Sequence, residues 1–188
     1  MIFLWKDKER YILNLFEKGD HRGMDKFYEE YADYLNGICA RYISDEDMLK
    51  DVVQESFIKI FTRIREFEYR GKGSLNAWVT KIAVNEALMQ LRKDKQFICS
   101  LLETSSHDFP DDDPDTENLS LETLLFFIRK LPPGYRAVFN LFVIEEKSHK
   151  EIAKILQIQP DTSASQYLRA KKMLAEMIRE YKLKMENR

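Results

Sequence analysis

The side chains from residue 161 to residue 172 are of types that can read the edges of DNA bases. Small or hydroxyl-bearing residues come first: Thr162, Ser163, Ala164 and Ser165. They would let a helix approach a groove closely, so that Gln166 could pair with adenine and Arg169 with guanine or phosphate. Lys171 and Lys172 add cations that suit the phosphate backbone. The pattern predicts a recognition helix, although an ordinary solvated amphipathic helix would share it.

A second group of polar side chains recurs at helical spacing between residues 47 and 58. Its members would share one side of a helix, opposite an apolar stripe: Asp47, Asp51, Gln54, Glu55 and Ile58. Such a face is acidic with one apolar spot, and it could dock onto a basic helix of a partner. A charged face that simply contacts water is the plainer interpretation of the same residues.

A third group combines a basic, glycine-containing loop at residues 67–74 with the helix expected after it. Phe67 and Tyr69 supply aromatic rings near this loop. Cations and one amide follow on the helix and beyond its end: Lys81, Asn85, Arg92, Lys93 and Lys95. Rings that stack on bases, beside cations that follow the backbone, suit a splayed single strand. Alternatively the cations are merely solvated and the aromatic residues, Trp78 above all, belong to the core.

Catalytic chemistry finds no support in the sequence. There is no P-loop, no nucleophile with its base and no pair of Glu-x-x-His motifs on separate helices. Acidic runs at residues 45–51 and 111–113 could bind a hard metal ion, but the three histidines lie far apart and are expected to contact solvent: His21, His107 and His149. We therefore expect no catalytic residue, no metal site, no cofactor and no enzyme activity.

Amphipathic helices must position these groups of side chains. The N-terminal half of the chain contains three such helices. Apolar residues recur at spacings of three and four over residues 24–42, 48–64 and 78–91. Only 6 Gly and 5 Pro occur in 188 residues, which disfavours a turn-rich strand fold. The pattern predicts a small helical bundle, with Ser74 or Asn76 as a cap for its last helix.

The C-terminal part predicts a helix-turn-helix. One helix runs over residues 121–128, and the next begins near Pro133, which suits a first helical turn. Ser148 and Glu151 fit a capping box for a third helix. A turn at residues 157–159 leads to a last helix from about residue 160 to 181.

An acidic stretch separates these two parts. Residues 103–117 hold seven Asp and Glu and no Lys or Arg, so the rest of the chain is net positive although the whole carries −2. Pro110, Pro114 and a Ser/Thr cluster fit a flexible linker, and a long surface loop within one domain is the alternative. The sequence thus predicts an all-α chain of two small helical domains, at residues 1–98 and 119–188, joined by a flexible acidic linker at 99–118.

Bulk features indicate a cytoplasmic protein without membrane insertion. No run approaches the ~20 apolar residues that a membrane helix needs, and the apolar start of the chain is too short for a signal peptide. The two cysteines, Cys39 and Cys99, form neither a metal signature nor a disulfide framework. Cys39 falls within a helical stripe and is expected to be buried.

Together these segments resemble the extracytoplasmic-function (ECF) sigma factor family. Residues 47–61 look like the family's polymerase-binding helix, and residues 67–93 look like its promoter-melting and −10 segment. Residues 131–174 look like its −35 domain. The order, the spacing and the acidic stretch between the two parts carry the resemblance, which covers about residues 24–95 and 119–178.

The resemblance implies roles for residues in each segment. The coiled coil of the polymerase's largest subunit would be bound by Asp47, Asp51, Gln54, Glu55 and Lys59. The −10 element would be met by Tyr69, Arg70, Gly71, Lys72, Ser74, Lys81, Asn85, Arg92 and Lys93. The −35 element would be met by Thr162, Ser165, Gln166, Arg169, Lys171 and Lys172. The loop at residues 68–74 would capture a flipped base.

The implied partners are core RNA polymerase, promoter DNA and an anti-sigma factor that covers the binding surfaces until a signal arrives. A conventional two-domain helix-turn-helix regulator is the alternative. In that case residues 1–95 would bind a ligand or form a dimer, and DNA binding would not require polymerase.

Overall fold

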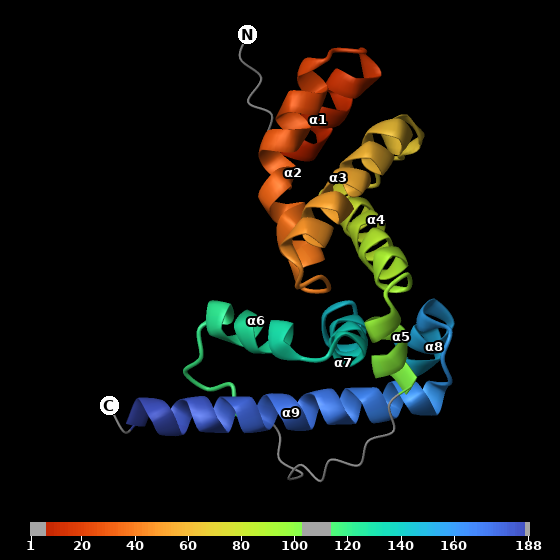
Figure 1. Ribbon diagram of the computed structural model, residues 1–188. Helices are drawn as coiled ribbons and strands as arrows, with labels where there is room; N and C mark the ends of the chain where they lie inside the picture. The colour runs from red at the N-terminus through yellow and green to blue at the C-terminus, as the bar shows by residue number, and fades with distance from the viewer. Residues whose placement is uncertain (1–6, 103–113, 187–188) are drawn as a thin grey trace. The chain divides into compact units, whose positions relative to one another are not determined.

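The computed structural model describes residues 7–102 and 114–186, and all regular secondary structure in them is helical (Figure 1). The chain forms two compact units. The first comprises Met1–Ala40 and Asp45–Ala87, and the second comprises Arg41–Ser44 and Leu88–Arg188. The predicted all-α fold with two helical parts is confirmed.

Four helices make up most of the first unit: α1 (Lys8–Glu17), α2 (Arg22–Ala40), α3 (Glu46–Arg63) and α4 (Ser74–Leu91), the last turn of which belongs to the second unit. A single 3₁₀ turn at Ile64–Glu66 follows α3. Aromatic rings fill the core. Phe27 stacks on Tyr31 at a centroid distance of 4.4 Å and meets Phe61 edge-on at 5.5 Å. Phe16 of α1 packs 6.4 Å from Phe27, which ties this first helix to α2.

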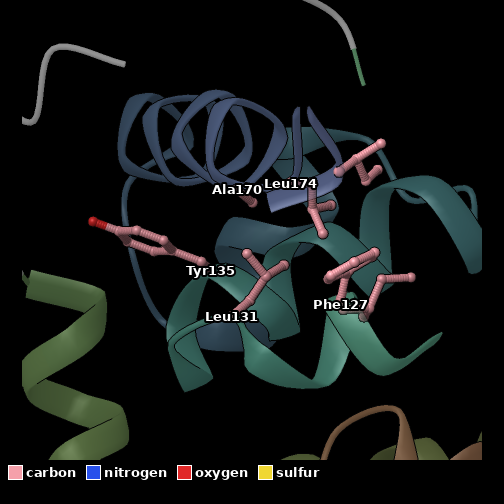
Figure 2. Close-up of a cluster of buried hydrophobic side chains, with 7 residues drawn as sticks. Phe127, Leu131, Tyr135, Ala170 and Leu174 are labelled. Atoms are coloured by element: carbon pink, nitrogen blue, oxygen red, sulfur yellow. The ribbon is translucent and has the colours of Figure 1, made fainter. Parts of the chain in front are cut away.

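The second unit contains α5 (Lys95–Leu102), α6 (Leu121–Lys130), α7 (Pro133–Phe139), α8 (His149–Leu156) and α9 (Pro160–Glu186). A π-helical turn at Asn140–Ile144 extends α7. Figure 2 shows Phe127, Leu131 and Tyr135 of the α6–α7 segment facing Ala170 and Leu174 of α9 in one buried cluster. The long helix α9 therefore carries both the expected recognition residues and three of the seven buried residues of this core.

Local capping explains several helix boundaries. The Asp45 carboxylate accepts a hydrogen bond from the Met48 amide at 2.8 Å and starts α3. Ser148 and Glu151 form the predicted capping box at the start of α8, and Pro133 stands in the first turn of α7 as expected. Gln157 ends α8 in a left-handed conformation with φ of 58°, a position that glycine often fills.

Helix α5 belongs with the helix-turn-helix and not with the preceding helices. Its Ser100 hydroxyl accepts a hydrogen bond from the Gly134 amide at 2.8 Å, and Phe97 is 1% exposed. A Cβ on Gly134 would lie 2.8 Å from that hydroxyl and 3.0 Å from the Leu101 amide, so glycine permits the close approach of α5 and α7.

This division differs from the expected one, in which the first domain ended at residue 98 and a linker covered 99–118. Residues 99–102 are helical and belong to α5, which packs against α7. Residues 103–113 of the acidic stretch lie outside the described residues. For those residues the flexible linker stays a prediction.

A buried arginine joins distant segments of the second unit. Arg136 is 4% exposed, and its guanidinium donates to the backbone carbonyls of Tyr42 at 3.0 Å and Arg129 at 2.7 Å. Burial, together with the nearby charge of Arg129, lowers the pKa of Arg136 to about 10.

Two expectations drawn from bulk features can also be compared with the structure. Cys39 and Cys99 are not joined by a disulfide, and Cys39 is buried as predicted. Within residues 7–102 and 114–186, none of the helices combines the length and the hydropathy that a membrane span requires.

Candidate protein- and nucleic-acid-binding surfaces

The outer face of α3 presents the predicted acidic group to solvent. Asp47, Asp51, Gln54 and Glu55 are all exposed, and Ile58 is 46% exposed beside them. The opposite side of the helix packs into the core through Leu49, Val52, Ser56, Phe57 and Ile60. Positions four, seven, eight and eleven residues after Asp47 fall on one face of a helix, so the structure brings this group together as the spacing predicted. We call it the α3 surface.

Lys59 differs from the rest of the predicted polymerase-binding set. Its ammonium group lies 2.5 Å from the Glu86 carboxylate of α4, and the Glu86 side chain is only 7% exposed. Among the described residues, no donor reaches the second oxygen of that carboxylate. Lys59 therefore compensates a buried charge between α3 and α4, besides being partly accessible on the α3 surface.

The basic loop before α4 depends on two glycines. Gly71 and Gly73 have φ values of 119° and 89°, which L-residues rarely adopt. Ser74 closes the turn, since its hydroxyl donates to the Gly71 carbonyl at 2.6 Å and accepts from the Arg70 amide at 3.2 Å. Ser74 is thus occupied within the loop and does not cap α4 as one alternative had it.

Two carboxylates of α1 hold this loop. Glu9 accepts hydrogen bonds from the Gly73 amide, at 3.0 Å to each oxygen, and from the Leu75 amide at 3.4 Å. The Tyr69 hydroxyl donates to Asp7, which raises the pKa of Tyr69 to about 12 and lowers the pKa of Asp7. The loop that was expected to be flexible is therefore held at both of its ends. Each end donates a hydrogen bond to a carboxylate at the start of α1.

Sequence reasoning missed Asp7 and Glu9 as loop partners. They precede the first apolar stripe that the sequence revealed, and they lie 62 to 66 residues from the groups they bind. The sequence offered only a local signal, namely that an Asp such as Asp7 can cap a helix. In the structure Asp7 is the N-cap of α1, and its carboxylate accepts a hydrogen bond from the Arg10 amide.

The cations of the third group remain on the outside of the first unit. Arg70 and Lys72 on the loop are exposed, as are Lys81 and Asn85 four residues apart on α4. Phe67 packs 5.2 Å from Trp78 and both rings are half-buried, so they serve the fold at least in part.

Arg92 and Lys93, at the end of α4, fall in the second unit. Lys93 is exposed, and the Arg92 guanidinium donates to the Ile155 carbonyl near the end of α8. Arg92 therefore satisfies a helix C-terminus, where a cation is favourable.

The predicted recognition helix is the first part of α9, and burial separates its residues into two faces. Asp161, Ala164, Ser165 and Leu168 are exposed, with Leu168 at 44%. Thr162, Arg169, Lys171 and Lys172 are half-buried. The exposed face thus begins with the small residues expected there and includes Leu168, which the sequence had not singled out.

Gln166 is a correction to the predicted DNA-contact set. It is 1% exposed, and its amide nitrogen donates to the carbonyls of Ser100 at 3.1 Å and Leu101 at 3.0 Å. Gln166 therefore satisfies the C-terminal end of α5 and cannot present its amide to a base in this conformation.

His149 also differs from expectation, since it is half-buried and makes contacts within the second unit. Its ring stacks on Phe142 at a centroid distance of 4.5 Å, and its Nδ1 lies 3.0 Å from the hydroxyl of Ser163. Ser163 is fully buried, so this contact explains a polar residue at a core position of α9. His21 is exposed as predicted, and His107 lies outside the described residues.

Comparison with known protein families gives two matches along the chain. Residues 27–97 match the family model of Sigma-70 region 2. Residues 121–174 match the family model of Sigma-70 region 4. The first range contains the α3 surface and the basic loop, and the second contains the helix-turn-helix.

Known proteins align with this chain over most of its length and most of their own. The ECF RNA polymerase sigma-E factor of Haemophilus influenzae is 30% identical, in an alignment covering 89% of this chain and 93% of that protein. The ECF RNA polymerase sigma factor SigW of Bacillus subtilis is 28% identical over 87% of this chain and 93% of its own.

A solved structure shares the fold. CnrH, determined in complex with the cytosolic domain of CnrY, aligns with a TM-score of 0.51 over 93% of this chain and 99% of its own, at 18% identity. That likeness concerns the fold alone.

Proposed function

The chain belongs to the ECF family of RNA polymerase sigma factors, and from this premise we propose how its surfaces direct core RNA polymerase to promoters. The α3 surface docks on the polymerase. The basic loop and α4 engage the −10 element, and α9 engages the −35 element. The chain acts in the cytoplasm as a binding subunit without catalysis of its own.

Docking through the α3 surface is supported by its charge and exposure. Four polar residues, three of them acidic, surround the exposed Ile58 on one helix face. Acidic groups steer the approach to a basic partner helix, while an apolar spot contributes contact area. Lys59 takes part from the edge of this surface, where Glu86 orients it.

Promoter opening is assigned to the loop at residues 68–74 and the exposed face of α4. Arg70, Lys72 and Lys81 would follow the strand backbone, with Asn85 beside them. A base extruded from the duplex costs a few kcal/mol of unstacking, which pocket and strand contacts offset. Gly71, Tyr69 and Ser74 shape the loop, while Lys93 and Arg92 extend the cationic side toward the end of α4.

Recognition of the −35 element is assigned to the exposed and half-buried residues in the first part of α9. Thr162 and Ser165 lie where a recognition helix meets base edges, and Arg169, Lys171 and Lys172 suit the phosphates. Gln166 is left out of this set because it is buried. Leu168 joins the set, since an exposed apolar side chain can contact a thymine methyl group.

We further infer control by an anti-sigma factor, which the family membership supports. Such a partner would cover the α3 surface, where the exposed Ile58 and the carboxylates offer one apolar and several charged contacts. Promoter use would then follow release of that partner.

The observation that carries the proposal is the presence of both family regions in one chain, with an exposed acidic helix face in the first and an exposed helix-turn-helix in the second. The test is transcription in vitro with bacterial core RNA polymerase and a genomic promoter library. We expect specific start sites that require this chain. Folded protein that neither binds active core polymerase nor produces such starts would refute the proposal.

A charge reversal tests the docking surface. Asp51→Arg should weaken binding to core polymerase about tenfold or more, because like charges then face each other across the interface. The exposed Asp33→Arg on α2 is the matched control and should bind as the wild type does. Fluorescence titration measures the affinities, and thermal melting verifies that both variants fold. Equal affinities for the two variants would exclude the α3 surface as the docking site.

A further inference from the structure

Helix α1 makes hydrogen bonds to both limbs of the basic loop. Its N-cap residue Asp7 accepts from Tyr69 on the incoming limb. Two residues later, Glu9 accepts from the amides of Gly73 and Leu75, where the loop becomes α4. One helical turn of α1 thus holds two points of the loop that are separated by several residues.

The loop has few other means to keep its conformation. Gly71 and Gly73 have positive φ values, and no neighbouring atom lies within 4 Å of a Cβ built at either position. Packing therefore does not fix these glycines, and their unfolded freedom is the largest of any residue. The Ser74 hydroxyl closes only the inner turn, through the Gly71 carbonyl.

Glu9 also supplies what the start of α4 lacks. The first amides of a helix have no partner within the helix, and an anion near them is favourable. A side chain at the helix start usually accepts these bonds, but Ser74 is turned toward Gly71. The Glu9 carboxylate takes that place from another helix, and Glu9 is only 8% exposed.

These carboxylates are poorly suited to touch DNA themselves. Both would repel phosphates, and their oxygens already accept hydrogen bonds from the loop. The side chains of Arg70 and Lys72 between the two anchored points remain exposed. The arrangement separates residues that hold the loop from residues that face outward.

We propose that Glu9, assisted by Asp7, is a positioning residue that holds the loop at residues 68–74 ready to receive an unpaired base. This inference rests on the proposed function and deepens it, because it adds α1 to the parts on which promoter opening depends. It predicts that loss of the Glu9 carboxylate impairs opening while leaving docking through the α3 surface intact.

The test compares Glu9→Ala and Glu9→Gln with the wild type as full-length protein. Glu17→Ala is the matched control, because it removes an exposed carboxylate from the other end of the same helix. Hydrogen exchange of the Gly73 and Leu75 amides reports the loop in the free protein. Binding to core polymerase, and permanganate detection of strand opening on the strongest promoter from the library, report function.

For Glu9→Ala we expect faster exchange at both amides and promoter opening reduced about tenfold, with core affinity within about twofold of the wild type. Glu9→Gln keeps one acceptor oxygen and should be intermediate. The control should match the wild type in all measurements.

Three results would overturn the proposal. The first is opening by Glu9→Ala at the wild-type level. The second is unchanged amide exchange. The third is an equal loss of core binding and opening, which would indicate general destabilisation. A wild-type chain that binds no polymerase would instead refute the proposed function, so the two failures are distinguishable.

Discussion

Gln166 lies in the interior of the second unit, where its amide nitrogen donates to two carbonyls at the end of α5. A helix C-terminus that is buried needs such donors, since its last carbonyls have no partner within the helix. The neighbouring Ser165 is exposed, and its hydroxyl donates to the Asp161 carbonyl of its own helix. Adjacent polar residues on α9 therefore belong to different faces and have different roles.

Replacement of Gln166 tests this division. Gln166→Ala should lower the free energy of unfolding by about 1–3 kcal/mol, because two buried carbonyls lose their donor. Ser165→Ala should leave stability nearly unchanged and alter only discrimination among −35 sequences. Urea unfolding followed by circular dichroism measures the first effect. An unchanged stability in Gln166→Ala would show that the buried hydrogen bonds contribute little.

Residue roles could be predicted where the partner is near in sequence. The Ser148–Glu151 box and Pro133 at a helix start follow from local rules, and both were confirmed. The roles of Glu9 and Gln166 depend on partners 64 to 66 residues away, and the periodicity of one helix does not identify such partners. A buried glutamine and an exposed one have the same letter, so only the tertiary contacts distinguish them.

At the scale of elements, the turn between α8 and α9 sets the direction in which the recognition helix α9 follows α8. Gln157 takes the left-handed conformation there, and its amide donates to the Ala153 carbonyl. A left-handed conformation costs an L-residue roughly 1–2 kcal/mol. The turn is therefore strained at the one position where helix-turn-helix sequences often place glycine.

Relief of this strain is a direct prediction. Gln157→Gly should raise the free energy of unfolding by about 0.5–1 kcal/mol, since glycine adopts this φ without a steric penalty but loses more freedom on folding. Lys154→Gly, within α8, should instead destabilise by about 1 kcal/mol. Thermal melting compares the two variants. Destabilisation by Gln157→Gly would mean that contacts of the glutamine side chain outweigh the strain.

Long helices with a continuous apolar stripe could be predicted as elements, whereas the short helices α1 and α5 could not. The stripes at residues 24–42 and 48–64 correspond to α2 and α3. Helices α1 and α5 have only 10 and 8 residues, and neither showed a recognisable stripe. Such short segments are marginal alone, so their helicity depends on the tertiary packing that the sequence pattern does not display.

At the scale of the whole molecule, net charge is a poor guide to the partners. The chain carries −2 in total, yet seven acids are concentrated in residues 103–117. The remaining residues are net positive and include the cations assigned to promoter DNA. From segregated charge of this kind we expect DNA contacts on some surfaces and resistance of the free chain to non-specific binding.

Neutralising part of the acidic stretch should weaken that resistance. Asp111→Asn, Asp112→Asn and Asp113→Asn together change the formal charge from −2 to +1. We expect tighter binding of the free chain to non-specific duplex DNA, and a larger gain at low salt. Fluorescence anisotropy over a salt series measures this. Neutralising Asp25, Glu29 and Asp33 on α2 is the control, and an equal gain there would mean that only total charge matters.

The close contact between Gly134 and Ser100 has a practical consequence for dissecting the protein. A fragment or a hybrid chain cut at residue 98 would split α5 and remove the buried Phe97 from the short helix whose Ser100 and Leu101 contact Gly134 and Gln166. The natural place to exchange DNA-reading modules between relatives is therefore upstream of Lys95. A hybrid chain should keep the promoter specificity of its donor only when α5 is transferred together with the helix-turn-helix that it packs against.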